Sequence, residues 1–256
     1  YGAQEIHYRW FMKHLNGDVR VRNVSDRRTG FQIAGPKSRE LLSLCTRFDV
    51  APVKFLDVVR MTVGQVDCTV QRVSYTGDLG YEIYCDPMDQ RQLWQTLWNA
   101  GQPLGITPFG MRAMMSLRLD RHFGSWLSEF SPDYTAAETG MDRFISFKKP
   151  DDFIGRKAAE AERDNPPTRI LATFEVDAED ADVVAYEPVF IDDSVQGFCT
   201  SGGYSHQAGK SIAIALIPRE HATAGKIVEI EIMGKRRKAT LITEHLFDPD
   251  GSAMRG

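Results

Sequence analysis

The order of hydrophobic and polar positions divides the chain into two parts. Up to about residue 160, segments with helical spacing are mixed with segments that alternate like strands. After Asn165-Pro166-Pro167 only strand patterns and turns follow. Since Pro166-Pro167 cannot lie inside a helix, we place a linker there and predict a first domain over 1–165 and a second over 166–256.

The first part is predicted to contain both helices and strands. Ile6, Trp10, Phe11 and Leu15 have the spacing of one helical face. Pro36 suits the start of a further helix, where a missing N–H costs nothing. The pattern predicts helices over 37–46, 88–99, 108–119 and 153–163, and strands over 19–24, 31–34, 60–66, 68–74 and 81–85.

The second part is predicted to be all β. Short apolar or alternating runs recur between turns, which is typical of a small barrel or a sandwich. The glycine-rich segment 200–206 is interpreted as a polar turn between two of these strands. The predicted strands are 170–176, 189–191, 197–200, 210–217, 227–233 and 238–243.

Composition narrows the function classes. The 256 residues are 42% hydrophobic and 26% charged, as in soluble globular proteins, and the net charge of −4 gives no reason to expect nucleic acid or a membrane surface as a partner. No apolar run approaches the roughly 20 residues of a membrane span. Because we expect the cysteines to be reduced, we expect a cytoplasmic protein, or one of the mitochondrial matrix. Because the chain begins at Tyr1 and enters a helical pattern at once, we also expect it to be the later part of a longer polypeptide.

The cysteines are expected to be reduced, buried and chemically quiet. Their spacing forms no metal-binding pair, and none has a histidine beside it in sequence. We predict no metal site and no catalytic thiol. The four are Cys45, Cys68, Cys85 and Cys199.

The turn at 75–82 carries the most chemistry. It is glycine-rich and leads into the predicted strand 81–85, with Tyr75 and Glu82 at its two ends. A phenol and a carboxylate on a rigid turn suit a flat heterocycle such as a pterin, whose ring N–H and exocyclic amine would share one carboxylate. Taken alone, the segment is more typical of an ordinary Gly/Asp β-turn between strands.

Six motifs in a fixed order favour a ligand-binding turn over an ordinary β-turn at 75–82. Together they resemble the glycine-cleavage T-protein (aminomethyltransferase) family, and most of all the folate-binding C-terminal region of sarcosine and dimethylglycine dehydrogenases. The resemblance implies an α+β fold, with a mixed α/β folate-binding region followed by a small C-terminal β-barrel domain. The motifs lie at 75–82, 110–120, 123–129, 135–141, 153–156 and 200–211.

The resemblance also implies a tetrahydrofolate site in which Tyr75 and Glu82 contact the pterin. The resemblance implies that the family's catalytic aspartate lies upstream of the residues present here, so no catalytic residue is assigned and the chain by itself is expected to lack that acid. Many T-proteins have an arginine where this chain has Met114, which we take as a mark of the dehydrogenase subgroup.

Two further residues are predicted to bind folate, each with an alternative. Arg118 could pair with the folate glutamate carboxylate, or form an internal salt bridge with Asp120 or Glu138. Trp126 could stack on the pterin or benzoyl ring, or pack under the loop that follows it. For Glu138 and the nearby Glu129, bracing of caps or loops is at least as strong an expectation as ligand contact.

The predicted function is a tetrahydrofolate-binding one-carbon transfer module, the C-terminal part of an FAD-dependent sarcosine or dimethylglycine dehydrogenase. It would take a methylated amine as the donor, and FAD only if an upstream domain or subunit supplies it. No G-x-G-x-x-G motif occurs in these residues. Two alternatives remain open: a folate-dependent demethylase of a sulfur compound, and a non-enzymatic folate-binding accessory protein.

Overall fold

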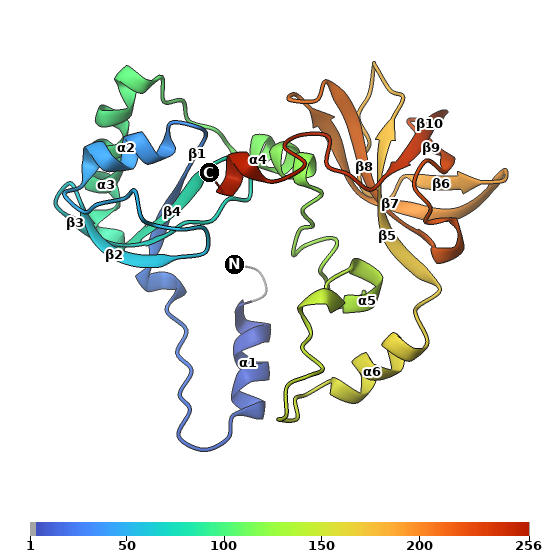
Figure 1. Ribbon diagram of the computed structural model, residues 1–256, viewed down its shortest axis with the longest axis horizontal. Coiled ribbons are helices and arrows are strands. Elements are labelled where there is room, and N and C mark those ends of the chain that lie inside the picture. Colours follow the sequence, from blue (N-terminus) through green and yellow to red (C-terminus); the bar gives the residue numbers. More distant parts are fainter. Residues whose placement is uncertain (1–3, 256) are drawn as a thin grey trace. The chain divides into compact units, whose positions relative to one another are not determined.

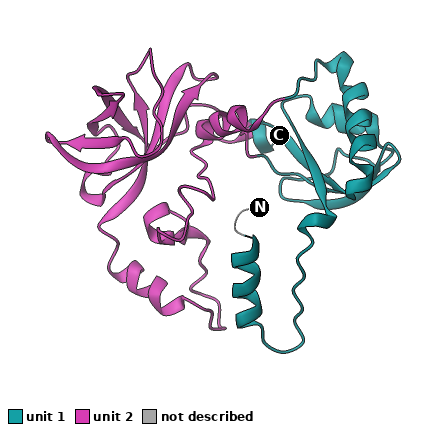
Figure 2. Ribbon diagram, turned by 180° about the vertical axis from the view of Figure 1, so that it is seen from behind, with its two compact units in different colours: residues 1–74, 78–108, 253–256 teal, residues 75–77, 109–252 magenta. Residues whose placement is uncertain are grey.

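The structure is a computed structural model that describes residues 4–255. It divides into two compact units, shown in two colours in Figure 2. Unit 1 comprises residues 1–74, 78–108 and 253–256, and unit 2 comprises 75–77 and 109–252. The turn at 75–82 is thus shared between the units: Tyr75 belongs to unit 2 and Glu82 to unit 1.

Unit 1 is a four-stranded antiparallel sheet with two helices on one face (Figure 1). The strand order is β1-β4-β3-β2. Its elements are α1 Gln4–His14, β1 Thr29–Ala34, α2 Ser38–Cys45, β2 Val58–Val63, β3 Val66–Gln71, β4 Gly80–Cys85, α3 Gln90–Gly101 and the terminal turn α7 Ser252–Arg255.

The period of two in these strands sends alternate residues to opposite faces. On β4, Tyr81, Ile83 and Cys85 are buried, whereas Glu82 and Tyr84 lie on the other face and are only partly covered. The buried face packs on Leu42 of α2 and Leu93 of α3 in one hydrophobic core. The polar residues of β4 therefore project from the face opposite that core.

Unit 2 combines short helices with a closed barrel (Figure 1). The barrel order is β10-β5-β8-β7-β6-β9. The helices are α4 Met111–Leu117, the 3-10 turn η4 Arg118–Arg121, α5 Ala136–Thr139 and α6 Arg156–Asp164; the strands are β5 Arg169–Val176, β6 Pro188–Ile191, β7 Ser194–Ser205, β8 Lys210–Pro218, β9 Ile227–Ile232 and β10 Lys235–Ile242.

The barrel is the small C-terminal β-barrel that the sequence predicts. Its core is formed by inward-facing aliphatic residues and Phe174, which is fully buried. Met233 and Gly234 connect β9 to β10 with φ of 50° and 78°, the two left-handed residues that a tight hairpin turn requires.

Two element predictions are wrong. Residues 19–24 form no strand: the alternating pattern is present, but no strand of the described chain pairs with it and Val19 and Val24 are exposed. The strand predicted over 197–200 runs as β7 from Ser194 to Ser205, so most of the turn expected at 200–206 is strand. A register shift between Cys199 and Ser201 admits this glycine-rich sequence into the ladder.

All four cysteines are free and buried, as predicted. Burial raises the pKa of each thiol, to about 12 for Cys68 and Cys199, so they stay protonated near neutral pH. No helix within residues 4–255 is long and apolar enough to cross a membrane.

The barrel makes a direct prediction at Gly197, where β7 passes close to β8. A Cβ there would lie 2.3 Å from the carbonyl oxygen of Leu216, a backbone atom that cannot move without breaking the ladder. Gly197→Ala should therefore lower the free energy of unfolding in urea by about 2 kcal/mol or more.

Gly110→Ala is the matched control, since a Cβ at Gly110 meets nothing within 4 Å. It should cost less than about 1 kcal/mol. Equal stability of the two variants would contradict the close approach of β7 and β8.

Candidate functional site

In unit 1, Glu82 is held by a neighbour on its own strand. The hydroxyl of Tyr84 donates to Oε2 of Glu82 at 2.5 Å. The Tyr84 ring lies against Gly30 of β1, where a Cβ would come within 2.8 Å of ring atom Cδ1. Glycine at position 30 thus provides the space that lets the phenol reach the carboxylate.

The Tyr84 phenol is protonated at neutral pH, as its hydrogen bond to Glu82 requires. Burial, and then the hydrogen bond and charge of Glu82, raise the pKa of Tyr84 well above its usual range. The phenol therefore remains a donor at neutral pH. It engages one carboxylate oxygen, and Oε1 of Glu82 has no hydrogen bond within residues 4–255.

In unit 2, Tyr75 contacts the loop that follows η4. Its hydroxyl donates to the carbonyl oxygen of Gly124 at 2.9 Å, and its ring stacks on Phe123 with centroids 6.1 Å apart and planes 8° apart. Burial is the main cause of the raised pKa of Tyr75. Tyr75 is thus a neutral donor that fixes the start of this loop.

Arg118 also bonds to this loop. Its side chain is 2% exposed and donates to the carbonyl oxygens of Met115 at 3.1 Å and Phe123 at 2.6 Å. Its Nη1 also lies 3.4 Å from Oε2 of Glu129. An internal salt bridge was one of the two predictions for Arg118, but its partner is Glu129 and not Asp120 or Glu138.

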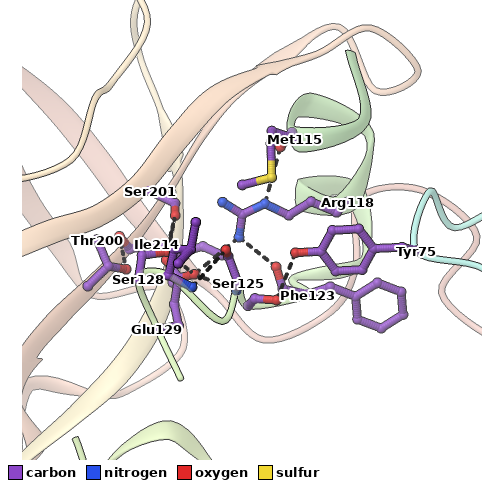
Figure 3. A network of polar contacts seen from close by, with 12 residues as sticks. Tyr75, Met115, Arg118, Phe123, Ser125, Ser128, Glu129, Thr200, Ser201 and Ile214 are labelled. Atoms are coloured by element: carbon purple, nitrogen blue, oxygen red, sulfur yellow. Dashed lines mark hydrogen bonds and ion pairs between the residues drawn. The ribbon is translucent and has the colours of Figure 1, made fainter. Parts of the chain in front are cut away.

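Glu129 is the centre of the network in Figure 3. It is fully buried and accepts the backbone N–H of Ser125 at 2.7 Å, the hydroxyl of Ser128 at 2.6 Å and the hydroxyl of Ser201 on β7. Burial opposes ionisation of Glu129, yet these hydrogen bonds outweigh it and lower its pKa. The carboxylate is therefore charged at neutral pH.

Trp126 lies at the tip of this loop. Its side chain is 75% exposed, and that of Leu127 is 87% exposed. Neither packs under the loop, which was the alternative to ring stacking for Trp126. Glu138 instead serves as predicted for a cap: it completes a capping box with Thr135 at the start of α5 and pairs with Arg169.

The structure thus brings three predicted residues into one unit, namely Tyr75, Arg118 and Trp126, and places Glu82 in the other. Sequence reasoning missed Tyr84, although two positions along a strand is the spacing that puts it beside Glu82. It also missed Ser201, which no local pattern joins to Glu129. Within residues 4–255 no cluster of His, Cys, Asp and Glu could hold a metal ion.

Two family descriptions match the chain. "GCVT N-terminal domain" covers residues 1–149, and "Glycine cleavage T-protein C-terminal barrel domain" covers residues 169–248. The chain belongs to the glycine-cleavage T-protein family. The interval between the two matches contains Pro166-Pro167, while the predicted domain boundary itself stays a prediction.

Individual relatives agree with this assignment. The mitochondrial dimethylglycine dehydrogenase of Rattus norvegicus is 37% identical over 90% of this chain, and an aminomethyltransferase of Alkaliphilus metalliredigens is 33% identical over 96%. The chain spans 27% of the dehydrogenase and 67% of the aminomethyltransferase.

The fold is shared with a solved structure. Aminomethyltransferase T of the glycine cleavage system from Bartonella henselae matches with a TM-score of 0.67 and 16% identity, over 88% of this chain and 85% of that one. At this identity the match establishes the fold only.

Next to the Arg118 turn, His122 is a partly buried base whose charged form the surrounding fold disfavours. It ends η4 with φ of 54°, and its ring lies 4.5 Å from that of His245. Burial, then the charges of His245 and Arg121, lower its pKa to about 4. Around His245 lie Arg121, Arg143 and Asp248 as further charged groups.

The free energy of unfolding should therefore decrease as the pH falls from about 6.5 to about 4. In this range His122 binds a proton in the unfolded chain but stays neutral in the folded protein. His122→Asn, which tolerates the left-handed backbone, should remove about 2 kcal/mol of this dependence between pH 7 and pH 5. Urea unfolding at the two pH values measures it, with His206→Asn, at an exposed position, as the control. The same slope in wild type and His122→Asn would show that His122 does not titrate in this way.

Proposed function

We propose that this chain is a tetrahydrofolate-binding, one-carbon transfer module, and the C-terminal part of an FAD-dependent sarcosine or dimethylglycine dehydrogenase. The observation that carries the proposal is Glu82: a strand carboxylate on the face opposite the core, oriented by Tyr84, with no hydrogen bond from residues 4–255 to its Oε1. Family membership supports the transfer chemistry.

The residues present fit a pterin. Its 2-amino group and adjacent ring N–H form a pair of donors that one carboxylate accepts together, and a carboxylate held by a neighbour loses little freedom on binding. Tyr84 supplies that hold, and Gly30 leaves the room for it. We assign the pterin edge to Glu82 and retain Tyr75 as a predicted contact on the loop side of the turn.

The work of the protein is then mainly positioning. Bound tetrahydrofolate supplies N5 and N10, the amines that accept the one-carbon unit. Glu82 of unit 1 fixes the ring's in-plane orientation. Stacking of a folate ring on Trp126, an exposed aromatic side chain of unit 2, is retained as a separate prediction. A fixed amine beside an incoming electrophile gains a large effective concentration. We assign no catalytic acid to this chain.

Arg118 takes a different place in this proposal. A direct contact with the folate glutamate stays a prediction. Since its side chain is 2% exposed and its observed bonds go to Met115, Phe123 and Glu129, its role in the proposal is to hold the loop that carries Trp126.

For the donor we propose an N-methyl amine, with FAD bound by a separate domain or subunit. The support is the similarity to the dehydrogenase from Rattus norvegicus over 90% of this chain. The sulfur-compound and accessory-protein alternatives have no observation that favours them. A flavin domain in the same polypeptide, or a flavoprotein subunit that copurifies with it, would support the amine assignment, and the absence of both would contradict it.

The folate assignment is tested by titrating the chain with tetrahydrofolate in a calorimeter. Glu82→Gln keeps the shape of the side chain but removes the charge that accepts two donors, so its Kd should rise about tenfold or more. Glu231→Gln, a half-buried strand carboxylate in the barrel, is the control and should bind like wild type. No saturable binding, or equal Kd values for wild type and Glu82→Gln, would overturn the proposal.

A further inference from the structure

The loop from Gly124 to Phe130 is folded around one buried carboxylate. Glu129 is fully buried and lies in the loop itself. It receives donors from three parts of unit 2: Ser125 and Ser128 within the loop, Arg118 on η4, and Ser201 on barrel strand β7 (Figure 3). One side chain thus connects the loop to the 3-10 turn and to the barrel.

Contacts between the two ends of the loop restrict its backbone conformation further. A Cβ at Gly124 would lie 2.5 Å from the ring of Phe130, so the two ends of the loop are in direct contact. The N–H groups of Ser128 and Phe130 both donate to the carbonyl oxygen of Ser125, at 3.3 and 3.0 Å. The backbone is therefore a closed turn whose interior is filled.

The exposed residues of the loop lie between its two points of attachment. Trp126 and Leu127 separate Ser125 from Ser128, and both of these serines donate to Glu129. The carboxylate therefore holds the chain on either side of the most exposed pair in the loop, whose side chains are 75% and 87% exposed.

A large exposed aromatic side chain contributes most to binding when its backbone is already ordered. Ordering a loose side chain on association costs about two- to tenfold in affinity. A loop held at both flanks avoids much of that loss, whereas a loop without its central carboxylate would have to be ordered by the ligand.

We propose that Glu129 is a positioning residue for ligand binding: it presents Trp126 and Leu127 as a rigid apolar face on which a flat ring of the folate ligand stacks. Glu129 itself touches no ligand. The inference rests on the proposed function and assigns the stacking partner and the residue that holds it. The ring is either the pterin or the benzoyl group, which share a flat π surface.

A double-mutant cycle tests this. Tetrahydrofolate is titrated into wild type, Glu129→Gln, Trp126→Ala and the double variant. If Glu129 acts through Trp126, each single substitution should raise Kd by about five- to tenfold and the double variant should bind no more weakly than Trp126→Ala. Independent losses that multiply in the double variant would overturn the inference.

Ser128→Ala is a second, less disruptive variant that tests the same coupling between Glu129 and Trp126. It removes one donor to Glu129 and leaves the ion pair with Arg118 in place. If Glu129→Gln does not fold, the cycle is run with Ser128→Ala, whose smaller loss of affinity should likewise vanish in the Trp126→Ala background.

Glu138→Gln is the matched control for a purely structural effect. Glu138 is also a buried carboxylate of unit 2 with an arginine partner, Arg169, but it caps α5 and makes no hydrogen bond to the loop. Its loss should lower the melting temperature and leave Kd unchanged. If Glu138→Gln weakens binding as much as Glu129→Gln, the effect is general destabilisation and the inference is wrong.

A second ligand shows which ring of the folate, the pterin or the benzoyl ring, stacks on Trp126. A tetrahydropterin without the benzoylglutamate part should still lose affinity in Trp126→Ala if the pterin stacks, and should be insensitive to it if the benzoyl ring does.

Failure of the inference can be told apart from failure of the proposed function. If Glu82→Gln weakens binding but Trp126→Ala and Glu129→Gln do not, only the inference is wrong. If wild type does not bind tetrahydrofolate, both the inference and the proposed function are wrong.

Discussion

The buried ion pair between Arg118 and Glu129 is the interaction on which the described site most depends. Removing two charges from water is costly, and a pair of this kind is favourable only when hydrogen bonds satisfy the rest of both groups. Here hydrogen bonds satisfy much of both groups: the guanidinium also bonds to two carbonyl oxygens through Nε and Nη1, and the carboxylate also accepts three donors. Either residue alone would leave an uncompensated charge in the interior.

That dependence explains the form of the loop. Because the donors to Glu129 come from separate elements, the loop can satisfy the carboxylate only in one arrangement, in which Ser125 and Ser128 turn inward and Trp126 turns outward. The conformation of the exposed residue is thus a consequence of buried electrostatics. In unit 1 a carboxylate is oriented by fewer contacts, since Tyr84 holds Glu82 of the same strand with a single hydrogen bond.

Local sequence predicts much of this fold for definite reasons. Alternation acts within a few residues, so β4 and β9 lie close to the ranges predicted for them, 81–85 and 227–233, although Met233 belongs to the turn with Gly234. The same reasoning failed at 19–24, because alternation shows that a segment could be a strand but not that another strand lies beside it.

What the sequence by itself determined is most of the elements, the family and the chemical character of the site: a tyrosine and a glutamate on a glycine-rich turn, and an arginine and a tryptophan after it. The tertiary structure decided how those groups are used. Only folding brings Ser201 of β7 to Glu129, 72 positions away, and only the closed loop makes Arg118 an internal partner while leaving Trp126 exposed. Long-range contacts of this kind depend on the barrel's register and on desolvation, which no local pattern encodes.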